Sequence, residues 1–111
     1  MKTFVFIITR TPYEGEYALS TINLAVALKN VCTSNCRVAL VFAGDGLYCL
    51  KKNQKTRSFS IEDSLYIAHS VGVEIYYTGT RKPRNTIKLA EPMDEEELGK
   101  LVKNSKCTMI I

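Results

Sequence analysis

The sequence predicts an α/β fold of three layers, in which helices cover both faces of a mostly parallel sheet. Continuous apolar runs rich in β-branched and aromatic residues recur along the chain, as expected of strands covered on both faces. Segments with helical periodicity alternate with these runs, and such alternation is typical of parallel sheets. The length of 111 residues favours a single domain, residues 1–111.

The first half of the chain has the pattern of a β-α-β unit. Residues 4–8 and 37–43 are uninterrupted apolar runs, and residues 16–31 between them have helical spacing. Right-handed crossover geometry places the two strands parallel to each other. Only a narrow stripe of the helix is polar, so we expect the rest to be covered, either by the sheet alone or by a partner chain as well, and we expect an oligomer rather than a monomer.

The second half of the chain begins with a predicted helix, and residues typical of helix caps mark both of its ends. Ser60 with Asp63 three residues later is a capping-box-like start, and Gly72 is a typical end. Residues 73–77 then have the composition of a third strand, and residues 87–89 are a candidate for a further short one.

The chain ends in another helix and strand. Asp94 with Glu97 predicts the start of the last helix, whose first turn is rich in carboxylates, and residues 107–111 form a final apolar run.

The loops after the strands are the expected place for function, because ligands of parallel α/β sheets bind at the carboxyl ends of the strands. These loops are residues 9–15, 44–50 and 78–85. The candidate binding residues that they contain are Thr11, Tyr13, Asp45, Gly46, Thr78 and Arg81.

Residues 44–49 permit two interpretations. One is a tight turn, with glycine supplying a positive φ and Leu47 and Leu50 tucked under the sheet edge. The other places Cys49 in the first turn of a short helix, where backbone N–H groups and Lys51 or Lys52 would lower its pKa. Cys49 is therefore the candidate catalytic residue.

The other cysteines are interpreted as reduced thiols that pack. The chain lacks an export signal and a membrane-length apolar run, which predicts a cytoplasmic protein with few disulfides. Cys32 and Cys36 lack further ligands for zinc, so we interpret them as packing residues or a chance pair rather than a metal site. Cys107 is expected to be a small core residue.

Two basic loops suggest an anion site or a surface for an acidic partner. They comprise residues 51–57 and 81–88, although the net charge is only +4. Nucleotide-binding glycine motifs and nucleic-acid-binding patterns are both missing from the sequence, so no cofactor is expected and nucleic acid is a poor candidate ligand.

The chain resembles the DsrE/DsrF-like family, which includes the TusBCD-type subunits of sulfur relays. The resemblance rests on the first strand followed by residues 11–15 (TPYEG), on the helix over residues 18–28, and on residues 41–48 (VFAGDGLY). The last helix and strand extend it over nearly the whole chain. The DsrF/TusC type is the most similar.

This resemblance implies a five-stranded, largely parallel sheet, assembly into oligomers with itself or related subunits, and a protein sulfur donor or acceptor. In the DsrE/TusD type the persulfide-carrying cysteine follows the strand that corresponds to residues 73–77, where this chain has Thr78 or a neighbour.

Three functional hypotheses therefore remain open. We favour a non-catalytic or binding subunit of the DsrF/TusC type. The alternatives are a sulfurtransferase that carries a persulfide on Cys49 and a small module that binds an anion or another ligand.

Overall fold

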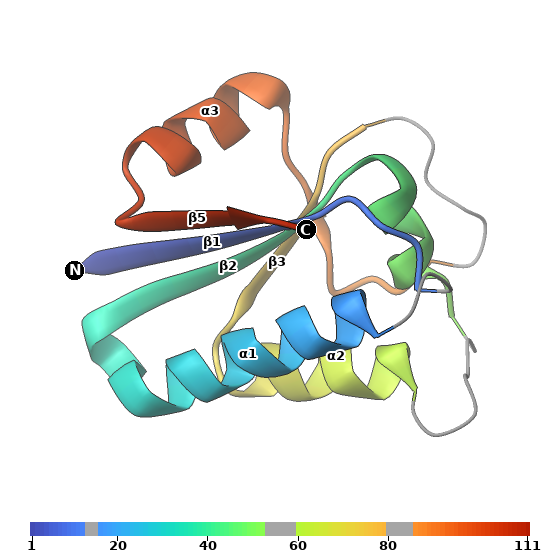
Figure 1. The fold of residues 1–111 in the computed structure, drawn as a ribbon, viewed down its shortest axis with the longest axis horizontal. Helices are drawn as coiled ribbons and strands as arrows, with labels where there is room; N and C mark the ends of the chain where they lie inside the picture. Colours follow the sequence, from blue (N-terminus) through green and yellow to red (C-terminus); the bar gives the residue numbers. More distant parts are fainter. Residues whose placement is uncertain (13–15, 53–59, 80–85) are drawn as a thin grey trace.

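A five-stranded sheet forms the centre of the computed structural model, which describes residues 1–12, 16–52, 60–79 and 86–111 (Figure 1). All neighbouring strands run parallel, in the order β4-β3-β2-β1-β5. The strands are β1 (Lys2–Ile8), β2 (Cys36–Phe42), β3 (Glu74–Tyr77), β4 (Glu91–Pro92) and β5 (Cys107–Ile110). This sheet confirms the predicted fold class.

Helices cover both faces of the sheet, as predicted. In Figure 1, α1 (Tyr17–Cys32) and α2 (Ile61–Ser70) lie on one side and α3 (Glu95–Lys103) lies on the other. Two short 3₁₀ helices follow α1 and β2, namely η1 (Thr33–Asn35) and η2 (Gly44–Leu50). None of the helices in the described residues is long and apolar enough to cross a membrane.

The predicted helix ends are confirmed by their hydrogen bonds. The Ser60 hydroxyl accepts from the Asp63 amide at 3.3 Å, and the Asp94 carboxylate accepts from the Glu97 amide at 2.7 Å. Each bond satisfies an amide that the first helical turn leaves without a partner. Gly72 follows α2 with a φ of +99°, a conformation that glycine adopts without steric cost.

The expectation of a strand at residues 87–89 is wrong, because the fourth strand is β4. The Ile87 amide donates to the Leu50 carbonyl at 2.8 Å, and Ile87 is buried in the main core. This bond directs the segment toward the end of η2 instead of β3. The chain reaches β3 only where Glu91 pairs with Tyr76.

Two apolar clusters hold the layers together. The larger one fills the space between the sheet and α1 and α2, around buried side chains such as Ile8, Ile22 and Leu65. The smaller one packs Leu101 of α3 against Val5 and other residues of the opposite face. Both faces of β1 and β2 are thus covered, which explains their continuous apolar sequences.

The outer parts of β5 and α1 remain exposed. Cys107 lies on the edge strand and is exposed, so the expectation that it is a core residue is wrong. Tyr17, Leu24 and Val31 recur every seven residues on α1 and expose 55%, 47% and 84% of their surface; we call them the α1 stripe. The sheet and α2 therefore cover only part of this apolar helix.

Candidate functional site

The loops at the carboxyl ends of the strands are brought together by backbone hydrogen bonds. The Ala43 amide donates to Ile8 at 3.0 Å, and the Thr78 amide donates to Phe42 at 3.0 Å. These bonds align the loops that follow β1, β2 and β3. Figure 1 shows the strands converging on this edge, with η2 beside it.

The candidate binding residues that the structure describes belong to these adjoining loops. Asp45 is exposed, Thr11 and Thr78 are half-buried, and Gly46 is buried. Tyr13 and Arg81 lie outside the described residues, as do most positions of both basic loops. The described part of the edge therefore offers a carboxylate and two hydroxyl groups to solvent or to a partner.

Gly46 shapes this edge by its close approach to β1. A Cβ atom at this position would lie 1.9 Å from the Ile8 carbonyl oxygen, so only glycine fits without a shift of backbone. The positive φ expected of a glycine in this loop is confirmed at Gly44, at +54°. The expected burial of Leu47 and Leu50 is confirmed, but the segment forms a short helix, as the second interpretation expected, rather than a tight turn.

Cys49 differs from the reactive thiol that the second interpretation described. It is the sixth residue of the seven in η2, rather than part of the first turn, and is 1% exposed. Its Sγ donates to the Arg10 carbonyl at 3.6 Å. Burial raises the pKa of this thiol to about 12, so the expected lowering of the pKa is wrong.

The polar side chains around this edge make contacts of their own. The guanidinium carbon of Arg10 lies 4.9 Å from the centre of the Tyr17 ring, within the range of cation–π contacts. This contact fixes the described start of the β1–α1 loop against the first turn of α1. Among the described residues, no group of three or more His, Cys, Asp and Glu could hold a metal ion.

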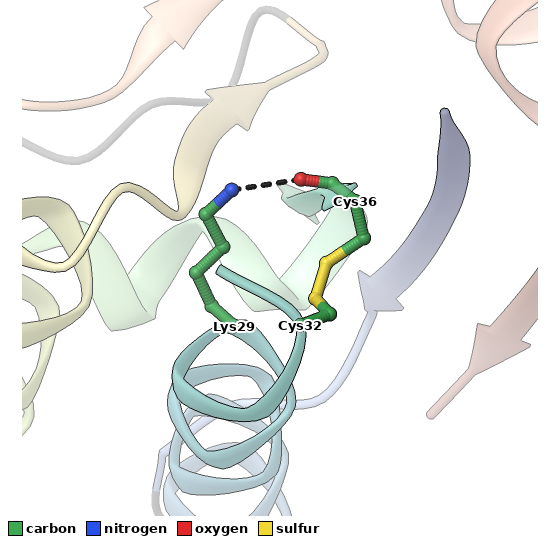
Figure 2. Close-up of a disulfide and its surroundings, with 3 residues drawn as sticks. All are labelled: Lys29, Cys32 and Cys36. Carbon is green, nitrogen blue, oxygen red and sulfur yellow. Dashed lines mark hydrogen bonds between the residues drawn. A yellow bond between two sulfur atoms is a disulfide. The ribbon is translucent and has the colours of Figure 1, made fainter. Parts of the chain in front are cut away.

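Cys32 and Cys36 lie at the amino ends of the strands, away from the loops described above, and are joined by a disulfide (Figure 2). The expectation that they are separate reduced thiols is therefore wrong. The turn of η1 brings their Cα atoms to 5.7 Å, within the usual range for disulfides. Sequence spacing alone did not show this, because it depends on how sharply the chain turns between α1 and β2.

A polar cluster on the α3 side of the sheet was also missed by the sequence analysis. The Arg37 guanidinium donates to both carboxylate oxygens of Glu74, at 2.6 and 2.8 Å, and the Tyr76 hydroxyl donates to the same carboxylate. Burial acts to raise the pKa of Glu74, whereas the hydrogen bonds from Arg37 and Tyr76 act to lower it. The hydrogen bonds outweigh burial, so the pKa of Glu74 lies below its ordinary value. The sequence offered one indication of this cluster, namely that Arg37 and Glu74 are charged residues near the starts of two strands.

Part of this cluster borders a surface cavity of about 300 Å³ between the sheet and α3. Arg37 and Tyr76 line it together with Lys100 and Asn104 of the α3 segment. Arg37 is paired with Glu74, and the other charged residues of the described lining, Glu97 and Lys100, are exposed, so this lining has no unpaired buried charge that would identify a ligand.

Comparison with known proteins identifies the fold and the family. The chain is similar to the YchN protein of E. coli, whose crystal structure matches it with a TM-score of 0.85 over 100% of both chains at 20% sequence identity. At that identity the match shows the fold alone. No curated protein matches the chain in sequence. The model of the DsrE/DsrF-like family matches residues 2–80. Since this match spans more than half of the chain, the chain belongs to the DsrE/DsrF-like family.

Proposed function

We propose that this chain is a DsrF/TusC-like subunit of a sulfur-relay system, and that it binds a relay partner without carrying the sulfur itself. Proteins of its family are generally related to sulfur relay and are typically oligomeric. The carboxyl edge of the sheet, with Thr11, Asp45 and Thr78, is the proposed contact surface for the partner.

The accessibility of the cysteines is the observation that carries this proposal. A persulfide forms when a thiolate attacks a sulfane sulfur, so the acceptor must be both ionisable and exposed. Cys49 is the cysteine of the carboxyl edge, and it is buried with a pKa raised to about 12. The residue after β3 is Thr78, whose hydroxyl cannot form a persulfide.

The α1 stripe supports the oligomeric part of the proposal. Tyr17, Leu24 and Val31 expose apolar surface along the whole length of α1. Covering such a stripe with another subunit removes apolar area from water, at roughly 25 cal/mol per Å².

The first experiment measures intact mass after incubation with a persulfide donor. Cys107 is an exposed thiol at the start of β5, away from the proposed contact surface, so the unmodified chain and a Cys107→Ser background are both tested, and no added sulfur is expected on Cys107. We expect no added sulfur on Cys49, and we expect Thr78→Cys in the same background to gain one sulfur at residue 78. Added sulfur on Cys49 would support the sulfurtransferase alternative and contradict the binding role.

The second experiment tests the binding role directly. The chain is mixed with a DsrE/TusD-type subunit that has a cysteine after its third strand, and complex formation is followed by sedimentation. We expect a complex that Asp45→Lys weakens and that Lys100→Glu, a change on α3, leaves intact. A chain that forms no complex at micromolar concentrations contradicts the proposal.

A further inference from the structure

The Cys32–Cys36 disulfide closes a junction that other contacts already hold. Cys36 is the first residue of β2, and this strand pairs with β1 from Lys2↔Cys36 to Ile8↔Phe42. The bridge spans a sequence separation of 4, so the loop that it closes is short. Closing a short loop removes less entropy from the unfolded chain than closing a long one. The pairing of β2 with β1 holds the start of β2 in place without the bond, so the bond can open while the sheet stays intact.

The two sulfur atoms differ in their access to solvent. Cys32 is half-buried at the end of α1, whereas Cys36 is 2% exposed and belongs to the core. In thiol–disulfide exchange an attacking thiolate must reach one sulfur along the line of the bond, and the other sulfur leaves. The structure thus makes Cys32 the sulfur that is attacked and Cys36 the leaving group.

A positive charge lies at the backbone of Cys36. The Lys29 ammonium donates to the Cys36 carbonyl at 2.7 Å, and Figure 2 shows the lysine side chain reaching across to that residue. The same charge also lowers the pKa of Glu74, so its field extends across the neighbouring strands. A nearby cation stabilises a thiolate, and a stabilised thiolate leaves faster.

We propose that Cys32 and Cys36 form a thiol–disulfide exchange site whose substrates are an external dithiol and an external disulfide. A thiolate of the dithiol attacks Cys32 Sγ, which breaks the bond to Cys36 and leaves Cys36 as a thiolate. The second thiolate of the dithiol then displaces Cys32, so that the external dithiol becomes a disulfide and both cysteines take up protons. The reverse reaction with an external disulfide restores the bond. This site is independent of the proposed relay function.

The main test follows the state of the two cysteines in buffers of reduced and oxidised dithiothreitol. Protein purified without reductant is equilibrated, quenched in acid, alkylated in denaturant so that the buried Cys36 is also accessible, and mapped by peptide mass. We expect a Cys32–Cys36 disulfide that opens with two alkyl groups gained and re-forms when oxidised dithiothreitol is added. Complete alkylation of both cysteines before reduction overturns the proposal, and so does a bond that stays closed in excess reduced dithiothreitol.

Single-cysteine variants test which sulfur is attacked. In Cys36→Ala, Cys32 is expected to form a mixed disulfide with an external disulfide reagent. In Cys32→Ala, the buried Cys36 is expected to remain unmodified under the same conditions. The opposite pattern overturns the assignment of Cys32 as the attacked sulfur.

Variants of Lys29 test whether the charge at the Cys36 backbone makes Cys36 a better leaving group. Lys29→Gln is expected to slow reduction about two- to tenfold, because Cys36 becomes a poorer leaving group. Lys29→Arg keeps the charge and is expected to keep the rate, and Lys100→Gln on α3 controls for a change in net charge. Equal rates for Lys29→Gln and the unmodified chain overturn the role of Lys29.

Discussion

At the scale of single residues, the contact between Gly46 and the end of β1 determines the shape of the carboxyl edge. The Gly46 amide donates to Ala43 at 2.9 Å, which turns the chain directly after β2. The space for a side chain is already occupied by the Ile8 carbonyl. A glycine beside Asp45 is therefore a steric requirement of the packed structure, and it places the carboxylate at the surface.

Replacing Gly46 with alanine is expected to destabilise the protein by roughly 2–4 kcal/mol, since backbone must move to admit the Cβ atom. Chemical denaturation measures this change. Gly99→Ala is the matched control, because a Cβ atom there meets nothing within 4 Å in the middle of α3. The control is expected to be neutral or stabilising by up to about 1 kcal/mol. Equal effects of the two changes would contradict the steric argument.

At the scale of elements, the Arg37–Glu74 pair joins β2 to β3 near their amino ends. Ala39 pairs with Glu74 in the register of the two strands, so Arg37 reaches across from the position two residues earlier. The guanidinium meets the carboxylate in a two-pronged arrangement, which is stronger and more directional than a single contact. Tyr76 adds a further bond on the same face.

Glu74→Gln is expected to lower the free energy of unfolding at pH 7 by roughly 0.5–1 kcal/mol, a modest value because both side chains are partly exposed. The folded-state pKa of Glu74 lies below its ordinary value of 4.5. The stabilisation is therefore full above that value and is lost as the pH falls through the folded-state pKa. Denaturation of both proteins between pH 7 and pH 3 measures whether the difference shrinks.

The exposed Glu96–Lys100 pair of α3, at 3.5 Å, provides the control for this measurement. Glu96→Gln is expected to change the stability by less than about 0.5 kcal/mol at either pH. A Glu74 effect that is no larger than the Glu96 effect would show that the pair does not stabilise the sheet.

At the scale of the whole molecule, the layers are covered unequally. Two helices pack on one face of the sheet and α3 alone packs on the other (Figure 1). The α1 stripe remains exposed even though α1 also contributes buried side chains to the main core. A helix that is apolar on its inner and outer sides is typical of a subunit within an oligomer.

Sedimentation at micromolar concentration is therefore expected to give a mass above the 12.5 kDa of one chain. Leu24→Glu and Val31→Glu are each expected to shift the distribution toward the monomer, because a charge in a buried interface is costly. Ile67→Glu on α2, which is likewise exposed, is the control and is expected to leave the distribution unchanged. A monomer at all concentrations contradicts the oligomer proposal.

The strands with continuous apolar runs, the helices and the capped helix ends were all predictable from the amino-acid sequence. These features depend on periodicity and on hydrogen bonds between residues close in the chain, such as Ser60 with Asp63. The parallel topology followed from the alternation of elements, and it located the carboxyl edge with Asp45 and Thr78.

The environment of each cysteine and the course of the chain before β4 depend on tertiary contacts and were not predictable from the sequence. The burial of Cys49, the pairing of Cys32 with Cys36 and the exposure of Cys107 all depend on which surfaces meet after folding. Likewise, residues 87–89 form no strand because the Ile87 amide bonds to distant Leu50. Local patterns do not specify such long-range contacts, yet burial and proximity determine whether a thiol ionises, pairs or reacts.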